Sequence, residues 1–308
     1  MHFDLAKHTI FETIVGSQVY GVAGPTSDTD YRGVVVPPRA IVQSAFKRFE
    51  QAEFKDPDRV LYDIRKFVML AADCNPTIIE LFFIPERFWQ QSSACWDTLY
   101  KARSLFLSTQ ACHTFSGYAI QQLKRMQIHV RWMQRAPVEP KPEDFGLSHA
   151  LCLGKDEVGA YDWLVAGAYV RFSKEIMQLM SRVKGYQQAL KEWKNYQEWK
   201  TNRNPARAAL EQRYGYDTKH AYHLVRLARL GEELLATGTM TLADRVDQDE
   251  LRAIRNGAWS YDQIMAFTEQ IDARMAACEA RSALPKAPDR AVLDGVCNDV
   301  MEAFWCSD

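Results

Sequence analysis

The stretch TIVGSQVYGVAGPTSDTDYRGVVVPP, at residues 13–38, constrains the fold more than any other part of the chain. An apolar, β-branched run ends at Gly16, and a second run contains three consecutive valines and stops at a pair of prolines. Short apolar runs bounded by glycine and proline are typical of strands. We therefore expect two strands, at 11–15 and 30–36, joined by a polar turn.

The rest of the sequence changes from a mixed pattern to a helical one. Residues 59–62 predict a third strand, and the run DIRKFVMLAAD at 63–73 has its apolar residues at helical spacing. From about residue 92 the helical pattern continues almost to the end. A proline-rich segment at 136–143 predicts a loop within it, and Gly238 predicts the C-terminus of a helix.

Length and composition agree with a folded α+β chain. The 308 residues suffice for one large or two ordinary domains, and 47% apolar and 25% charged residues are ordinary values for a globular protein. We expect a small mixed sheet with helices at residues 1–110, followed by a helical domain at 111–308. The net charge of −1 gives no global attraction to nucleic acid or membrane. The basic run at 124–135, KRMQIHVRWMQR, fits either a local nucleic-acid surface or a solvent-exposed helix.

Other features point to a cytoplasmic protein. The first residues, MHFDLAKHTIFETIVG, lack the basic start and apolar run of a signal peptide, and we find no uninterrupted apolar segment as long as a membrane helix. Seven scattered cysteines without a C-x-x-C pair predict reduced thiols, not a disulfide framework or a zinc site.

The polar residues of the opening stretch suggest a site for metal and phosphate. Alternate residues of a strand share a face, so Asp28 and Asp30 are expected to point the same way. Two neighbouring carboxylates repel each other, and a divalent cation such as Mg²⁺ removes that cost. Gly16 and Ser17 directly follow a strand, where backbone amides and a hydroxyl can cradle a phosphate. Each feature alone is common in ordinary turns, but the combination predicts a triphosphate site with one or two metal ions.

This arrangement resembles the DNA polymerase β superfamily of nucleotidyltransferases, whose signature is an apolar strand, Gly-Gly or Gly-Ser, a spacer and D-x-[DE] on a second strand. More closely, three segments resemble predicted phage and bacterial nucleotidyltransferases that are associated with RNA repair ligases: GSQVYGVAGPTSDTDYRGV, YDIRKFVMLAADCNPTIIELF at 62–82 and GYDTKHAYHLVRLARLGEELLATG at 215–238. The shorter segments LRAIRNG at 251–257 and SALPKAPD at 282–289 also have counterparts there. The resemblance covers most of the chain in the correct order.

The resemblance implies a third carboxylate on a neighbouring strand, beside Asp28 and Asp30. Asp58 and Asp63 are the candidates, and because they are five residues apart they cannot share a face of one straight strand. We prefer Asp63 as the third catalytic and metal-binding residue, since it follows an apolar pair, and keep Asp58 as the alternative. Either residue could instead be a solvated turn acid or a helix cap.

The third block predicts a basic stripe on a helix. Spacings of three and four place Lys219, His223 and Arg226 along one side. Such a stripe suits phosphate, which arginine can bind bidentately, although a solvated charged face has the same pattern. The resemblance favours nucleotide binding by these three residues together with Gly16 and Ser17.

The activity that the resemblance implies is metal-dependent transfer of a nucleoside monophosphate from a nucleoside triphosphate, ATP among them, to an acceptor hydroxyl. Mg²⁺ or Mn²⁺ would be the cofactor, and an RNA end or a tRNA in an RNA-repair context would be the acceptor. The alternatives are an inactive module that binds nucleotide or RNA, and a transferase that modifies a protein or a small molecule. We expect no membrane partner and a bacterial or phage-encoded source.

Overall fold

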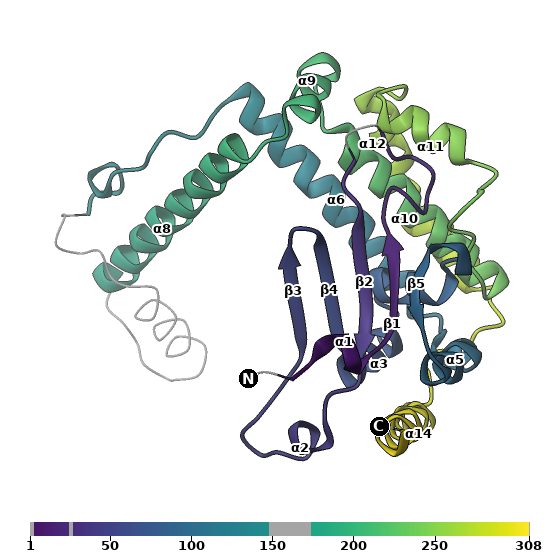
Figure 1. Cartoon of the computed structure of the whole chain (residues 1–308). Helices are drawn as coiled ribbons and strands as arrows, with labels where there is room; N and C mark the ends of the chain where they lie inside the picture. Colours follow the sequence, from purple (N-terminus) through teal and green to yellow (C-terminus); the bar gives the residue numbers. More distant parts are fainter. Residues whose placement is uncertain (1–2, 25–26, 148–173, 308) are drawn as a thin grey trace. The chain divides into compact units, whose positions relative to one another are not determined.

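The computed structural model describes residues 3–24, 27–147 and 174–307 (Figure 1). The chain forms two compact units, one of residues 1–126 with 214–308 and one of residues 127–213. This division differs from the boundary expected at residue 110. The physical reason is that C-terminal helices pack onto the N-terminal region: α14 (Arg290–Ser307) contacts both α3 (Ile64–Ala72) and α5 (Ala94–Lys101).

A mixed sheet organises the first unit (Figure 1). Its five described strands are β1 (Thr9–Val15), β2 (Asp30–Val35), β3 (Gln51–Lys55), β4 (Asp58–Asp63) and β5 (Trp89–Ser92), in the spatial order β3-β4-β2-β1-β5. β2 pairs antiparallel with β1 and parallel with β4. The three predicted strands are confirmed as β1, β2 and β4. The sequences of β3 and β5 are largely polar, because both strands lie at edges of the sheet, and they escaped prediction.

Helices before and after the sheet strands complete the first unit, and the expected α+β class is confirmed. Its further helices are α1 (Leu5–His8), α2 (Arg39–Val42), α4 (Pro76–Ile79), the beginning of α6 (Ala111–Gln134), α10 (Thr218–Thr237), α11 (Gln248–Arg255), α12 (Tyr261–Glu269) and α13 (Ile271–Glu279). Single 3₁₀ turns lie at η1 (Glu80–Phe83), η2 (Glu86–Phe88) and η3 (Arg103–Phe106). The predicted helix end at Gly238 is confirmed, because this residue has φ +67° and donates its amide to Leu234.

Stacked aromatic rings fix α3, α5 and η1 on one end of the sheet. Trp96 stacks on Phe11 of β1 with ring centres 3.7 Å apart, and on Phe82 at 5.6 Å. Phe67 of α3 meets Phe82 edge-on. The most buried residues of β1 come at its start and those of β2 at its end, which is the same end of this antiparallel pair. The opposite, less buried end of the pair carries Gly16 and Asp30.

The second unit is helical in its described residues. It contains the end of α6, η4 (Pro142–Phe145), α8 (Lys174–Thr201) and most of α9 (Pro205–Tyr214). Trp132 and Trp199 pack with ring centres 5.5 Å apart, and the buried Glu211 pairs with Arg203. Residues 136–141 form the predicted loop. The basic run at 124–135 covers the last residues of α6 and the residue after it. The role of this run as a nucleic-acid surface stays a prediction.

Two further sequence expectations concern cysteines and membranes. All six described cysteines are free thiols, and the seventh, Cys152, lies outside the described residues. Among the described helices none combines the length and the apolar character needed to cross a membrane.

Candidate nucleotide and metal site

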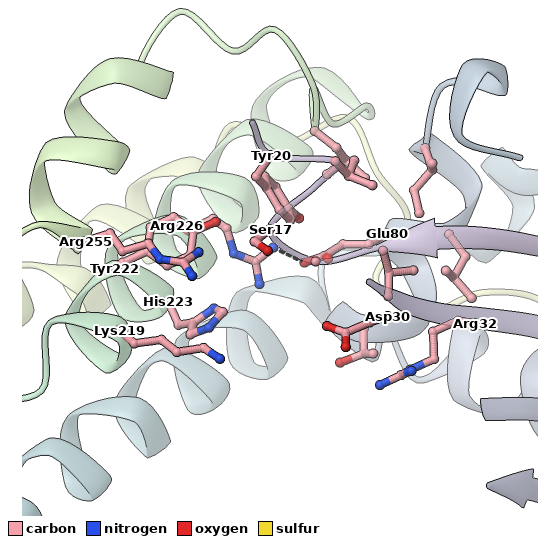
Figure 2. Close-up of a pocket in the computed structure, with 17 residues that line it drawn as sticks. Ser17, Tyr20, Asp30, Arg32, Glu80, Lys219, Tyr222, His223, Arg226 and Arg255 are labelled. Atoms are coloured by element: carbon pink, nitrogen blue, oxygen red, sulfur yellow. Dashed lines mark hydrogen bonds and ion pairs between the residues drawn. The ribbon is translucent and has the colours of Figure 1, made fainter. Parts of the chain in front are cut away.

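The open end of β1 and β2 faces a cavity of about 210 Å³ (Figure 2). Its lining comes from three parts of the chain: the end of β1 with the turn behind it and β2, the region of α4 and η1, and the helices α10 and α11. Six of the residues predicted from sequence line this one cavity: Gly16, Ser17, Asp30, Lys219, His223 and Arg226. The structure therefore brings together the first and third motif blocks, which lie far apart in the sequence.

We call the β1–β2 side of the cavity the strand wall, formed by Gly16, Ser17, Asp30 and Arg32. Gly16 has φ +70°, and a Cβ atom at this position would lie 3.1 Å from Asp30 Oδ2. The chain then folds into a tight turn, in which the amide of Val22 donates to Ser17 O at 3.0 Å. Glycine is required here both for the backbone conformation and for the close approach of the Asp30 carboxylate.

Strand register decides which third carboxylate approaches Asp30. In the parallel pairing of β2 with β4, Tyr31 lies opposite Arg59, so Asp58 is the residue of β4 that lies nearest the Asp30 end. Asp63 lies opposite Val35, at the far end of β2. The structure thus brings Asp58 toward Asp30 and does not bring Asp63 to the cavity, which favours the alternative assignment over the preferred one.

Asp63 instead has a structural position at the junction of β4 and α3. Its side chain is 1% exposed and caps α3 by accepting the Arg65 backbone amide at 2.7 Å. The Arg65 guanidinium also donates to Asp63 Oδ2 at 2.6 Å. These bonds occupy both carboxylate oxygens, as expected for a helix cap. We preferred Asp63 because this residue follows an apolar pair. Apolar residues indicate that the end of a strand is buried, but they do not indicate whether that end faces the cavity.

Asp30, the carboxylate of the strand wall, is influenced by neighbouring charges. The pKa of Asp30 is raised, first by partial burial and then by the neighbouring Asp58, with a smaller effect from Asp28. Arg32 and Lys219 oppose this rise. Asp28 itself is exposed, and Asp58 is half exposed and accepts a hydrogen bond from Arg32 at 3.1 Å. Negative charge next to Asp30 thus disfavours its ionised form, which is the electrostatic setting that a divalent cation relieves.

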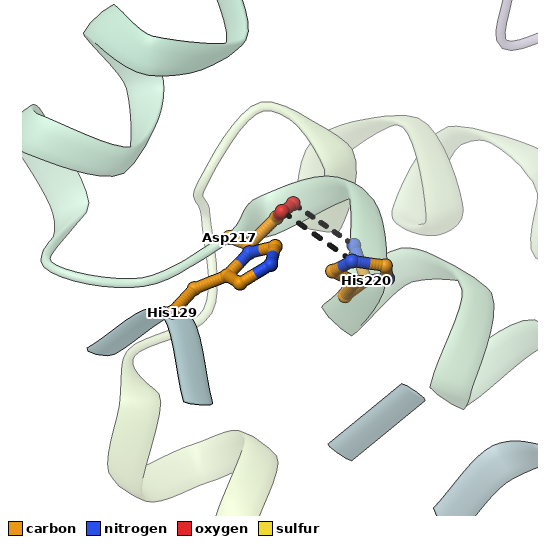
Figure 3. A group of neighbouring side chains, drawn as sticks. All are labelled: His129, Asp217 and His220. Atoms are coloured by element: carbon orange, nitrogen blue, oxygen red, sulfur yellow. Dashed lines mark hydrogen bonds and ion pairs between the residues drawn. The ribbon is translucent and has the colours of Figure 1, made fainter. Parts of the chain in front are cut away.

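The opposite side of the cavity, the helix wall, is formed by Lys219, Tyr222, His223 and Arg226 of α10 and by Arg255 of α11. The start of α10 is fixed by Asp217, whose side chain accepts the amides of Lys219 and His220 at 3.0 and 3.2 Å. The His220 ring lies 3.6 Å from the Asp217 carboxylate (Figure 3) and 2.8 Å from the side-chain oxygen of Gln122. His220 thus supports the start of the helix, while Lys219, His223 and Arg226 of the same helix line the cavity.

Arg226 is the most buried cation of the helix wall. Its Nη1 donates to Glu80 Oε1 at 2.8 Å, and its guanidinium carbon lies 4.2 Å from the ring centre of Tyr20. Burial alone would lower the pKa of Arg226, but the Glu80 carboxylate raises it above the ordinary value. The pair joins η1 to α10 across the cavity floor. Glu80 could have been recognised only through a tertiary contact, because 146 positions separate it from its partner.

His223 and Tyr222 are neutral members of the helix wall. Burial lowers the pKa of His223 well below 6.5, and the charges of Arg226 and Lys219 lower it further. Burial raises the pKa of Tyr222 to about 12. At neutral pH the imidazole is therefore uncharged, with one ring nitrogen able to donate a hydrogen bond and the other able to accept one.

Helix α11 holds the turn behind Gly16 in place. The Gln248 side chain donates to Tyr20 O at 3.1 Å, and Arg252 donates to Gly21 O at 2.6 Å. α11 is in turn tied to α10 by Arg229, which donates to Asp247 and Glu250 at 3.0 and 2.7 Å. The turn and the helix wall are consequently parts of one connected structure. The local pattern of the LRAIRNG segment gave no sign of this function.

The donor set suits a metal-bound polyphosphate. Asp30 lines one side of the cavity, and Asp58 and Asp28 are close enough to act electrostatically on it. Carboxylates of this kind supply the hard oxygen atoms that Mg²⁺ prefers. Lys219 and the two arginines supply positive charge at the other side. A ligand that carries a cation toward the strand wall and phosphate oxygens toward the helix wall would complement both.

Comparisons with known proteins give one family match and one partial relative. Residues 3–143 match the model of the RlaP family, described as the RNA repair pathway DNA polymerase beta family. The chain is also 26% identical over 132 residues to an uncharacterized 38.9 kDa protein from the nrdC–mobD intergenic region of Enterobacteria phage T4. That match spans 39% of each protein, so it covers well under half of the phage protein's length. No solved structure matches the chain significantly.

Proposed function

We propose that this protein is a metal-dependent nucleotidyltransferase that acts on RNA, because residues 3–143 match the model of the RNA repair pathway DNA polymerase beta family. In this proposal it transfers a nucleoside monophosphate from a nucleoside triphosphate to an acceptor hydroxyl. The family description supports the general class and the RNA-repair context. The cofactor, the substrate and the residue roles given below are our proposals.

One observation carries the proposal beyond the family. Gly16, Ser17 and Asp30 line the same cavity as Lys219, His223 and Arg226, although the family match ends at residue 143. A carboxylate beside a Gly-Ser turn has ordinary structural explanations, and so has a basic stripe on a helix. Their convergence on one cavity has the charge distribution required by a metal-bound triphosphate.

Asp28, Asp30 and Asp58 are the residues that would hold Mg²⁺ or Mn²⁺. When bound, such a cation would neutralise these carboxylates and withdraw charge from the phosphate oxygens. Asp63 is excluded from this role in our proposal, because Arg65 and the start of α3 occupy its oxygens.

The protein side chains have separate roles in the reaction. Ser17 and the adjoining turn orient the triphosphate, while Lys219 and Arg226 offset its charge. The acceptor oxygen forms a bond to the α-phosphorus, the bond from that phosphorus to the bridging oxygen breaks, and pyrophosphate leaves. The acceptor proton passes to Asp58, a half-exposed carboxylate beside the strand wall.

A label-transfer experiment tests the activity. The full chain is incubated with each α-labelled nucleoside triphosphate and Mg²⁺, with RNA, tRNA, DNA or protein offered separately as acceptor. We expect label on RNA or tRNA and release of pyrophosphate. Label on protein alone would contradict an RNA acceptor but support transfer chemistry, and label on no acceptor would support the inactive binding module instead.

Matched variants decide whether the observed label comes from this site. The double variant Asp28→Asn, Asp30→Asn should lose transfer while keeping its circular dichroism spectrum. Asp299→Asn, which changes an exposed carboxylate on α14, should retain full transfer. Wild-type activity in the double variant would reject the assignment of the site.

A further inference from the structure

Arg255 is a cation of the cavity that the sequence motifs did not predict as a site residue. It lies at the end of α11, and its side chain lines the cavity together with Arg226 (Figure 2). Its guanidinium carbon lies 5.9 Å from the ring centre of Tyr222. It forms no ion pair and no side-chain hydrogen bond with any of the described residues. An arginine on a concave wall without an acidic partner is open to an anionic ligand.

Arg226 provides an independent indication of a ligand at the same place. The residue is 8% exposed, and its Nη1 is used by Glu80. Its Nε is buried and has no hydrogen-bond partner in the described part of the chain. Buried donors in native proteins are normally satisfied, so this atom indicates an acceptor that arrives from the cavity.

The guanidinium groups of Arg255 and Arg226 line the same cavity and act electrostatically on the same two neighbours. Both lower the pKa of His223, and both lower the pKa of Tyr222 against the larger effect of burial. Glu80 neutralises Arg226, and His223 is uncharged at neutral pH, so the charge of Arg255 has no compensation within this group. Figure 2 shows Arg255 and Arg226 on the opposite side of the cavity from Asp30 and Arg32.

We propose that Arg255 and Arg226 form a subsite for the two terminal phosphates of a nucleoside triphosphate, and thus for the pyrophosphate product. This inference rests on the proposed function and adds to it the residues that hold the leaving group, with Arg255 as a binding residue that the proposed function did not include. The planar guanidinium of Arg255 offers paired donors to phosphate oxygens, and Arg226 contributes its remaining N–H groups from the cavity floor. Binding of this group does not need the carboxylates of the strand wall.

Calorimetric titration of inorganic pyrophosphate tests the subsite directly. The full chain is titrated in EDTA at constant ionic strength, so that no divalent metal takes part. We expect binding by the wild type, and affinity reduced about tenfold in Arg255→Ala, since a charge-assisted pair of bonds is lost. Arg255→Lys should recover part of this loss, because it restores charge without the paired donors.

A control variant and a measurement of stability show whether a loss of binding comes from the subsite itself. Arg281→Ala removes an exposed arginine whose side chain bonds to Ala277 O, and it should bind pyrophosphate like the wild type. Arg255→Ala should keep the wild-type melting temperature, since the side chain forms no ion pair in the described structure. Failure of the wild type to bind pyrophosphate, or equal affinity in Arg255→Ala, would overturn the inference.

Label transfer then distinguishes this inference from the proposed function. If Arg255 is required for pyrophosphate binding but no nucleotide is ever transferred, the subsite stands and the enzymatic function fails. If transfer depends on Asp30 while Arg255→Ala binds pyrophosphate normally, the function stands and the subsite fails.

Discussion

The strand wall and the helix wall of the cavity place their charges by different physical means. On the strand wall, Asp30 is positioned as the first residue of β2, and the register of β4 against β2 brings Asp58 beside it. These carboxylates remain partly or largely exposed. On the helix wall, Arg226 is buried and is held by Glu80, a residue from a distant part of the chain.

Because the carboxylates are at least partly exposed and Arg226 is buried, substitutions in the two walls should affect activity and stability differently. An exposed carboxylate can lose its charge with little effect on folding, because water solvates either form. A buried arginine that loses its carboxylate leaves an uncompensated charge in the interior. Substitutions of the carboxylates should therefore lower the rate of transfer, whereas substitutions of Arg226 or its partner Glu80 should also lower the free energy of unfolding.

The largest expected effect is on the strand wall. Asp30→Asn keeps the shape of the side chain beside Gly16 but removes a proposed metal ligand. We expect kcat for nucleotidyl transfer to fall about 1,000-fold, while the free energy of unfolding in urea changes little. Parallel losses of stability and activity in this variant would contradict the separation of roles between the two walls.

The helix wall should show the opposite behaviour. Glu80→Ala leaves the buried Arg226 guanidinium without its carboxylate, and we expect a loss of about 3 kcal/mol in the free energy of unfolding. Urea denaturation measures this, with Asp299→Asn as the exposed control. The double variant Glu80→Leu, Arg226→Met should recover much of the loss, because it removes both charges. A double variant no more stable than Glu80→Ala would show that the loss has another cause.

The same contrast explains how far the sequence predicted the molecule. The strands around Gly16 and Asp30 were recognised because glycine, proline and β-branched residues act locally on the backbone. The α10 stripe was recognised because helical spacing is also local. The contact of Arg226 with Glu80 and the position of Arg255 at the cavity depend on tertiary packing. Local periodicity in the sequence does not predict tertiary packing.

The third carboxylate shows where local reasoning fails. Alternation along β4 separates Asp58 and Asp63 onto different faces but does not say which end of the strand meets Asp30. That choice depends on β2 and β4 being parallel, which places Asp58 beside the open end and Asp63 at the buried end. The apolar residues before Asp63 correctly indicated that Asp63 is buried. The buried Asp63 side chain caps helix α3 and does not face the cavity.

A paired substitution of these two aspartates should sharpen the comparison. Asp58→Asn is expected to lower kcat about 100-fold without a matching loss of stability, because the side chain is half exposed. Asp63→Asn removes the charge that caps α3 and binds Arg65, and should cost about 2 kcal/mol in the free energy of unfolding. Transfer kinetics and urea denaturation on both variants provide the test. A larger kinetic defect in a stably folded Asp63→Asn would restore the sequence-based assignment.

The smallest effect concerns the neutral imidazole of the helix wall. The pKa of His223 is lower in the folded protein than its ordinary value of 6.5, because of burial and the neighbouring cations Arg226, Lys219 and Arg255. The unfolded chain therefore binds a proton more readily, and this residue's contribution to stability is present above pH 6.5 and lost as the pH falls toward the folded pKa. One proton corresponds to a slope of at most about 1.4 kcal/mol per pH unit.

Urea denaturation between pH 8 and pH 5.5 should reveal the contribution of His223 to stability as a difference between variants. His223→Gln keeps a polar side chain but cannot be protonated, so its stability should decline less steeply than that of the wild type below pH 6.5. His113→Gln, at an exposed position on α6, should follow the wild-type curve. If the His223→Gln and wild-type curves were parallel, the imidazole would not be held neutral by the cations of the helix wall, and the charge assigned to that wall would have to include it.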